Sequence, residues 1–198
     1  LLFKLVAKAK TITFPHMSTL PQDMDLEKFL GVDMGGTNVK MGIVDKMGNV
    51  HDFQSYPTVE WRNSPNFTGK MMDAIAYKFL SSKEVNRVGI GIPGLLSKDR
   101  RSPLEVPAIP ELNGILLQET LERRFKKVRF RMENDANAAA LGEFYFGNEE
   151  TGESFIFATM GTGIGGAAVL NNKLFNGGDG NSMEFGHIVS RNGRRLEQ

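Results

Sequence analysis

The feature that most constrains the fold is an alanine-rich segment directly behind a short apolar and basic run. Residues 128–132 (VRFRM) predict a β-strand, and residues 136–140 (ANAAA) predict a helix that follows it at once. Asn134 or Asp135 can cap that helix. Ligands of open α/β sheets gather at the carboxyl ends of strands, so Asp135 also lies where a general base would be useful. This segment alone leaves both roles of Asp135 open.

Composition narrows the class of protein. At 198 residues we expect one domain or two small lobes, and 40% hydrophobic residues are enough for a buried core. The balance of 24 Lys and Arg against 23 Asp and Glu argues against duplex nucleic acid as a partner and favours small ligands. The absence of cysteine excludes disulfides and thiolate nucleophiles and is compatible with a cytoplasmic location. The 22 glycines cluster in turns, which suggests that backbone approaches a ligand there.

The N-terminal segment is interpreted as a tail over residues 1–25. Residues 1–22 carry lysines and no acidic residue, and their apolar run is too short and too interrupted to span a bilayer. No signal-peptide cleavage pattern is present, so we expect neither membrane insertion nor secretion. Because the sequence starts at a leucine, we expect that an end of the natural protein is missing or altered, with Met17 or Met24 as alternative starts.

A glycine turn joins the first two predicted strands. Strands are expected in three segments that form an antiparallel meander, residues 26–33, 39–45 and 50–56. Residues 34–38 (MGGTN) form the first turn, whose glycines allow main-chain N–H groups to point at an anion. Thr37 and Asn38 add side-chain donors, and Asp33 is suited to hold a hydrated magnesium ion beside phosphates. A plain structural hairpin remains an alternative for this turn.

The middle of the chain alternates helices with a buried strand. Helices are expected over residues 67–80 and 115–125, and a parallel strand over residues 85–92. That strand ends in Pro93 and Gly94, a turn that leaves backbone exposed at the carboxyl edge of the sheet. The proline-rich loop over residues 95–113 is either a functional flap or a poorly ordered excursion.

A second strand–turn–strand unit follows a polar break between residues 143 and 154. Strands are expected over residues 154–159, 164–170 and 173–175, with an Asn-Asn turn between the last two. Gly161, Thr162 and Gly163 join the first two and repeat the glycine turn near Asp33, as two lobes holding one polyphosphate would. Residues 161–166 also match G-x-G-x-x-G, but no helix follows, so we reject a dinucleotide site.

Taken together, the motifs resemble the ROK family of sugar kinases and sugar-sensing repressors, most closely its glucokinases. They occur in the family's order as DMGGTNVK (33–40), GIPG (91–94), ENDANAA (133–139), GTGIGG (161–166) and EFGH (184–187). The resemblance implies an α/β, actin-like (ribonuclease H-like) fold with two lobes around a cleft. The N-terminal lobe would cover residues 26–146, and residues 147–198 would begin an incomplete second lobe.

The resemblance also implies an activity and roles for individual residues. ROK glucokinases transfer the γ-phosphoryl group of ATP to the 6-hydroxyl of glucose, a reaction of glycolysis, in the cytoplasm and as homodimers. Asp135 would be the general base and Asn134 would hold a neighbouring hydroxyl. Glu184 and His187 would bind ring hydroxyls, although an exposed acid and a structural histidine are the ordinary alternatives.

Further candidates follow from the same motifs. For the sugar they are Gly94, Asn113 and Glu197. For ATP they are Gly35, Gly36, Thr37, Asn38, Lys40, Gly161, Thr162 and Gly163, with Asp33 near Mg²⁺.

The sequence departs from the family in three ways. Many members bind zinc through a histidine at position 187 and three cysteines downstream, and a cysteine-free chain cannot form that site. Met183 stands where a small residue is usual before Glu184. Family enzymes are also longer, so an altered end is an alternative account of Glu197.

Other functions stay open at this point. A ROK repressor carries a DNA-binding module ahead of the kinase-like part, and the segment before the first predicted strand is too short for one. A filament or chaperone of actin-like fold would lack a sugar site, against which residues 184–187 argue. Another hexose, an N-acetylated amino sugar, or polyphosphate as donor is equally compatible with the motifs, because specificity depends on pocket shape.

Overall fold

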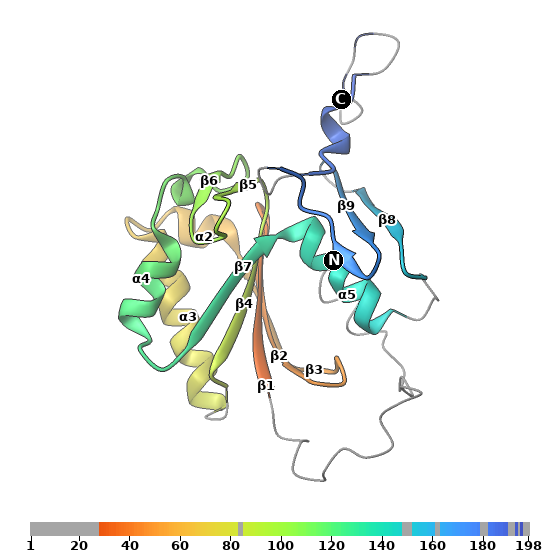
Figure 1. The fold of residues 1–198 in the computed structure, drawn as a ribbon. Helices are drawn as coiled ribbons and strands as arrows, with labels where there is room; N and C mark the ends of the chain where they lie inside the picture. Colours follow the sequence, from red (N-terminus) through yellow and green to blue (C-terminus); the bar gives the residue numbers. More distant parts are fainter. Residues whose placement is uncertain are drawn as a thin grey trace, which may run out of the picture.

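The computed structural model describes residues 28–82, 85–147, 152–160, 163–178, 182–189, 193 and 195. The tail interpreted for residues 1–25 lies outside the described residues. Figure 1 shows a large twisted sheet, helices α3 and α4 on one side of it, and helix α5 between it and a smaller sheet.

The large sheet combines a meander with parallel strands. Its strands are β1 (Lys28–Met34), β2 (Asn38–Asp45), β3 (Val50–Pro57), β4 (Arg87–Ile92) and β7 (Arg129–Asn134), in the order β3-β2-β1-β4-β7. β2 pairs antiparallel with β1 and β3, and β4 pairs parallel with β1 and β7. The predicted meander and the predicted parallel strand are both confirmed. The carboxyl ends of β1, β4 and β7 therefore meet at one edge.

The core lies between this sheet and its helices. The helices are α2 (Thr58–Arg62), α3 (Phe67–Ser81) and α4 (Leu117–Arg124). Asn66 caps α3 by accepting a hydrogen bond from the N–H of Gly69. Apolar side chains of the strands and helices are fully or almost fully buried together, among them Leu30, Val32, Met71, Ile75, Ile90, Leu121 and Phe130. The helix α2 was not predicted, because five residues are too short to show a helical period.

The proline-rich segment after β4 is a packed hairpin. It contains β5 (Leu95–Leu96), β6 (Pro103–Glu105) and the 3₁₀ turn η2 (Pro110–Leu112). Four apolar side chains anchor it to the core, Leu96, Val106, Ile109 and Leu112, each with no exposed surface. Of the two alternatives for this segment, the poorly ordered excursion is wrong, because these spaced apolar residues give the segment its own buried face. The functional flap stays a prediction.

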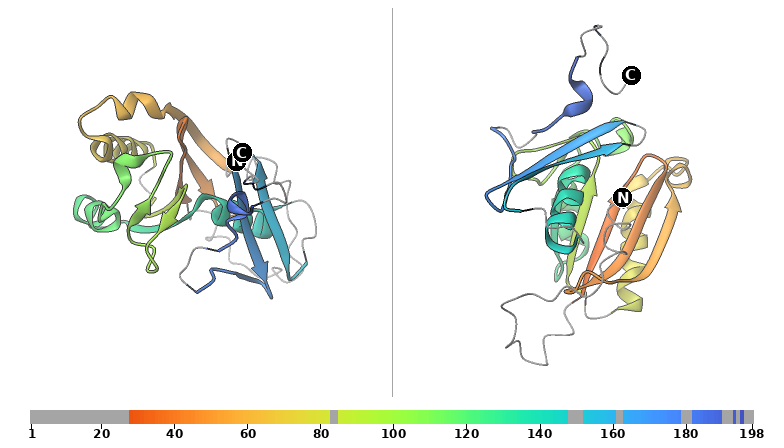
Figure 2. Two further views of the ribbon diagram at one scale, coloured as in Figure 1. Left: turned by 90° about the horizontal axis from the view of Figure 1, so that it is seen from above. Right: turned by 90° about the vertical axis from the view of Figure 1, so that its right-hand side faces the viewer.

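The second sheet is joined to the first through α5 (Asp135–Phe146). Its strands are β8 (Phe155–Met160), β9 (Ile164–Leu170) and β10 (Lys173–Leu174), all antiparallel. Asn171 and Asn172 both have positive φ, as the predicted two-residue hairpin turn requires. A strand follows residue 163, so the reason for rejecting a Rossmann site is confirmed. Figure 2 shows α5 held between the two sheets.

Small residues allow α5 and β9 to approach closely. Ala136, Ala139 and Ala140 are buried on α5. A Cβ placed on Gly165 of β9 would lie only 3.4 Å from the Cβ of Ala136. The next glycine, Gly166, faces the 3₁₀ turn η3 (Phe185–His187). Larger side chains here would push the second sheet away from the carboxyl edge of the first.

We predict that Gly166→Ala lowers the free energy of unfolding by about 1–3 kcal/mol, the usual cost of overpacking. The added Cβ would lie 2.2 Å from the Phe185 ring and 2.5 Å from the Met183 carbonyl oxygen, so backbone must move. Urea denaturation of both proteins gives the difference. The matched control is Gly142→Ala, which adds a methyl group to α5 where nothing lies within 4 Å and should be neutral or stabilising. Equal effects of the two substitutions would contradict the close contact.

Candidate active site

Predicted site residues lie side by side at the carboxyl edge of the large sheet. In the strand register Asp33 of β1 lies opposite Gly91 of β4, and Gly91 lies opposite Glu133 of β7. Asp135 begins α5 just beyond this row of residues. A Cβ atom added to Gly91 would lie 3.7 Å from the Cα atom of Asp135. The absence of a side chain at Gly91 therefore keeps the space beside the first turn of α5 open.

Asn134 is the residue that caps α5. Its Oδ1 accepts hydrogen bonds from the N–H groups of Ala136 (2.9 Å) and Asn137 (3.1 Å). Its Nδ2 donates to the carbonyl oxygen of Gly94 at 3.2 Å. Of the two caps that the sequence left open, the structure therefore selects Asn134. The capping requirement does not explain the carboxylate of Asp135, and the sugar-binding role of Asn134 stays a prediction.

The carboxylate of Asp135 is largely buried and interacts electrostatically with two other acids. Burial raises the pKa of Asp135, and the carboxylates of Asp33 and Glu184 raise it further. The N–H of Ala136 donates a hydrogen bond to Oδ1 of Asp135 at 2.9 Å, and this bond lowers the pKa of Asp135. The site therefore combines an acid from β1, one from α5 and one from the segment before η3. Within the described ranges, no cluster of His, Cys, Asp or Glu is arranged to bind a metal ion on its own.

The first glycine turn is tight and supported from α2. The N–H of Gly35 donates to the carbonyl oxygen of Asn38 (3.0 Å), and a Cβ on Gly35 would lie 2.7 Å from that oxygen. Thr58 donates its hydroxyl to the carbonyl oxygen of Gly35 (2.6 Å) and its N–H to that of Thr37 (2.9 Å). Gly36 and Thr37 are exposed at the tip. The turn is therefore a fixed backbone surface that can receive phosphate oxygens.

Lys40 lies beside Asp33 at the base of this turn. The two residues are register partners on β2 and β1, and the Nζ atom of Lys40 is 3.5 Å from Oδ2 of Asp33. A carboxylate oxygen at the sheet edge is a ligand that Mg²⁺ prefers, since this ion usually keeps several waters and takes one or two protein carboxylates. Asp33 therefore fits a magnesium ion shared with phosphates, and Lys40 fits a role in balancing their charge.

Two sugar-site candidates organise the hairpin after β4. Gly94 has φ of +96°, and a Cβ there would lie 2.2 Å from the carbonyl oxygen of Glu105. Glycine is required at this position. The Oδ1 atom of Asn113 accepts a hydrogen bond from the N–H of Val106 at 2.8 Å. Gly94 is linked to Asn134, whereas Asn113 has a structural contact and its sugar-binding role stays a prediction.

The second unit contributes residues at and after β9. Gly163 is exposed just before β9, while Gly161, Thr162 and Glu197 lie outside the described residues. Glu184 and His187 are exposed, and the N–H of His187 donates to the carbonyl oxygen of Glu184 at 3.1 Å. Met183 has φ of +64°, in the left-handed region that favours glycine. This backbone conformation explains why a small residue suits the position before Glu184.

Comparison with known proteins agrees with this arrangement. A family model described as "ROK family" matches residues 29–195. The chain belongs to the ROK family. The glucokinase of Streptomyces coelicolor is 37% identical over 162 residues, which are 80% of this chain and 49% of that protein. The xylose repressor of Bacillus subtilis is 30% identical over 167 residues, 81% of this chain and 42% of that protein. The chain thus spans about half the length of the curated relatives it matches.

Solved ROK structures show the same fold. The ROK family glucokinase of Streptomyces griseus, in complex with glucose and AMPPNP, has a TM-score of 0.68 and 35% identity. The match covers 81% of this chain and 50% of that one. The chain therefore has the mixed α/β, actin-like fold that the motifs implied, with an incomplete second lobe. None of the helices in the described part is long and apolar enough to cross a membrane.

The burial of Asp135 predicts a pH-dependent effect on stability. A raised pKa means that the folded state binds the proton more tightly, so ionisation of Asp135 lowers stability as the pH rises past the ordinary aspartate value. We expect Asp135→Asn to be more stable than wild type at pH 8, with a difference that shrinks towards pH 4. Urea unfolding at the two pH values measures it.

The matched control is Asp99→Asn, for which we expect a change in stability of the opposite sign. The Ser97 hydroxyl and the N–H of Arg101 hold the pKa of Asp99 below its usual value. Loss of that carboxylate should therefore lower stability at neutral pH. An Asp135→Asn difference independent of pH would contradict the burial of an ionisable base.

Proposed function

We propose that this protein phosphorylates a hexose at the expense of ATP, with glucose to glucose 6-phosphate as the leading reaction. The observation on which the proposal depends is the largely buried carboxylate of Asp135, whose pKa is raised by burial and by the negative charges of Asp33 and Glu184. Asp33 adjoins the glycine turn and Glu184 adjoins η3. The charge of Asp135 is therefore coupled to one acid beside the proposed phosphate turn and to one beside the proposed sugar segment, which supports a role between the two ligands.

Asp135 acts as the general base in this proposal. It accepts the proton of the attacking hydroxyl while that oxygen forms a bond to the γ-phosphorus of ATP. The bond between the γ-phosphorus and the β–γ bridging oxygen breaks, and ADP leaves with the electron pair. A raised pKa makes the carboxylate a stronger base near neutral pH than an exposed aspartate. Positioning supplies most of the remaining acceleration in phosphoryl transfer.

The two glycine turns hold the nucleotide. The N–H groups and side chains of Gly35, Gly36, Thr37 and Asn38 contact phosphate oxygens, and Gly161, Thr162 and Gly163 do so from the second unit. Asp33 would hold Mg²⁺, which would neutralise charge on the phosphates, and the ammonium group of Lys40 would add positive charge beside them. The bound AMPPNP in the Streptomyces griseus glucokinase supports ATP as the donor.

The sugar lies against Glu184 and His187, with Asn134, Gly94, Asn113 and Glu197 as further contacts. The bound glucose of the same relative supports a hexose in this family. We assign residues 26–146 to the first lobe and residues 147–198 to the second, with the sugar between them. We place the protein in the cytoplasm and expect a homodimer.

A sugar-responsive repressor is the second candidate, because xylose repressors are among the relatives. A repressor needs to bind its sugar without turnover. The buried, charge-coupled Asp135 favours catalysis over simple binding, since a base of raised pKa costs stability and gives a ligand-binding protein no advantage.

A coupled assay of ADP release tests the proposal on protein from the complete reading frame. A panel of glucose, mannose, fructose and N-acetylated amino sugars is offered with ATP and, separately, with polyphosphate. We expect glucose-dependent turnover with ATP. Asp135→Asn should bind glucose, measured by thermal stabilisation, and lose about a hundredfold or more of kcat, the scale of a general base. The absence of ADP release with every sugar, or an unchanged kcat in Asp135→Asn, would contradict the proposal.

A further inference from the structure

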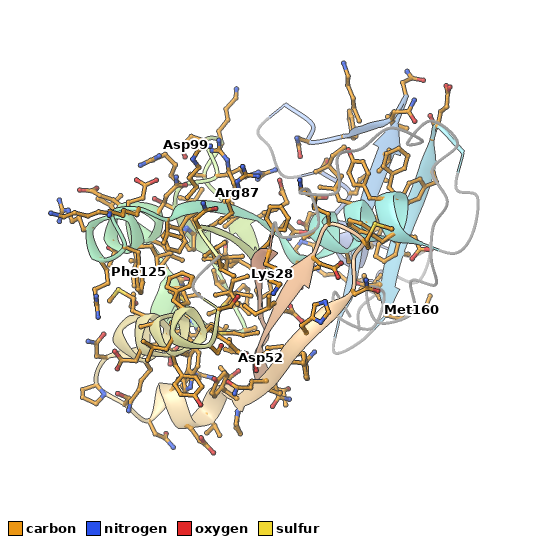
Figure 3. All side chains as sticks on the ribbon, turned by 90° about the horizontal axis from the view of Figure 1, so that it is seen from below. Lys28, Asp52, Arg87, Asp99, Phe125 and Met160 are labelled. Carbon is orange, nitrogen blue, oxygen red and sulfur yellow. The ribbon has the colours of Figure 1, made fainter. Side chains whose placement is uncertain are left out.

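Arg100 lies at the tip of the β5–β6 hairpin, in a backbone conformation held by its neighbours. The N–H of Arg100 donates to the carbonyl oxygen of Ser97 at 2.8 Å. The hydroxyl oxygen of Ser97 accepts from the N–H groups of Arg101 (3.1 Å) and Ser102 (3.0 Å). These bonds keep Arg100 at φ of +58°, which side-chain-bearing residues rarely adopt. This backbone conformation sets the direction in which the Arg100 side chain leaves the chain. Asp99, labelled in Figure 3, marks the position of the hairpin tip.

The guanidinium of Arg100 joins the two units of the structure. Its Nη2 atom lies 3.2 Å from Oε1 of Glu133, at the end of β7. The same Nη2 donates to Oδ1 of Asn176 at 3.1 Å. Asn176 follows β10 and precedes the segment with Glu184. The side chain of Arg100 is 16% exposed, against 46% for Arg101, so its charge is largely withdrawn from water.

Glu133 links Arg100 to the start of α5 through hydrogen bonds. Its Oε1 atom accepts a hydrogen bond from the N–H of Asn134 at 2.9 Å and one from Nδ2 of Asn137 at 3.0 Å. Asn137 is 2% exposed. A single carboxylate oxygen thus forms an ion pair with Arg100 and accepts hydrogen bonds from residues on both sides of Asp135. Charge-assisted hydrogen bonds of this kind are stronger than neutral ones and restrict geometry more tightly.

We propose that Arg100 is a positioning residue for phosphoryl transfer, which holds the first turn of α5 and the segment after β10 in register through Glu133 and Asn176. The inference rests on the proposed function and extends it to a residue outside the sequence motifs. Arg100 also offsets the negative charge of Glu133, which lies two residues before Asp135 at the same edge of the sheet as Asp33. An ordinary surface ion pair would contribute little to stability and would not affect turnover.

The test compares Arg100→Met with Arg101→Met in protein from the complete reading frame. Both substitutions remove a guanidinium from the same hairpin, and Arg101 pairs with the exposed Glu122 of α4. We expect Arg100→Met to lower kcat by about 10- to 100-fold, the scale of a small misplacement of reacting groups, with an unchanged KM for ATP. Arg100→Lys should recover part of the loss. Arg101→Met should match wild type in both constants.

Amide hydrogen exchange at Ala136 and Asn137 gives a readout that does not depend on turnover. Faster exchange at these amides in Arg100→Met than in Arg101→Met supports the positioning role, and equal rates overturn it. If the wild type phosphorylates no sugar, the proposed function falls while the exchange comparison still decides the role of Arg100. If the wild type is active, an equal kcat in Arg100→Met and Arg101→Met overturns the inference. A lower melting temperature of Arg100→Met without a loss of kcat overturns it as well. If Arg100→Met does not fold, Arg100→Lys serves in the same comparison.

Discussion

The arrangement of this site depends on keeping one ionisable carboxylate buried at the first turn of a helix. Burial of Asp135 costs free energy, and the charges of Asp33 and Glu184 add to that cost. Strong local structure must therefore hold it. Asn134 supplies the cap, its amide is tied to Gly94, and the backbone of Asn134 is tied to Glu133. Together these bonds fix the position of Asp135, as the proposed role of a base requires.

The contact between α5 and the second sheet depends on small side chains on both surfaces. Alanines on α5 face Gly165 of β9, and Gly166 leaves space for the ring of Phe185. The ring lies at the start of η3, between Glu184 and His187. The same alanine-rich sequence that favours a helix thus also sets how near the candidate sugar residues come to Asp135. One segment controls secondary structure, packing and the distance between candidate catalytic and binding groups.

Much of the architecture could be predicted because its signals are local. Alternating and continuous apolar runs identified the strands, and Asn171 and Asn172 identified a turn that only a few residue types tolerate. The choice between Asn134 and Asp135 as the cap could not be made, because both side chains can form that bond and the decision depends on Gly94, forty residues earlier in the chain. The packed hairpin after β4 was missed because its four buried residues are separated by prolines and by a run of polar residues, which hides their common face in the sequence.

Long-range contacts account for the supporting residues that sequence reasoning did not single out. Thr58 supports the first glycine turn from a helix too short to predict, and Arg100 reaches Glu133 from a hairpin tip. Neither belongs to a recognisable motif, and only the packed structure brings them to the site. The sequence correctly predicted that Asp135 follows a strand at the carboxyl edge of the sheet. The residues that support this edge, Thr58 and Arg100, could be identified only in the three-dimensional structure.

The most direct test of this account is a carboxyl-carbon NMR titration of Asp135 in the complete protein. We predict a pKa above the ordinary aspartate value, which falls towards that value in Glu184→Gln because one neighbouring negative charge is removed. A pKa at or below the ordinary aspartate value would show that the carboxylate is not buried, and a pKa that does not respond to Glu184→Gln would show that it is not coupled to Glu184. Either result would contradict the account.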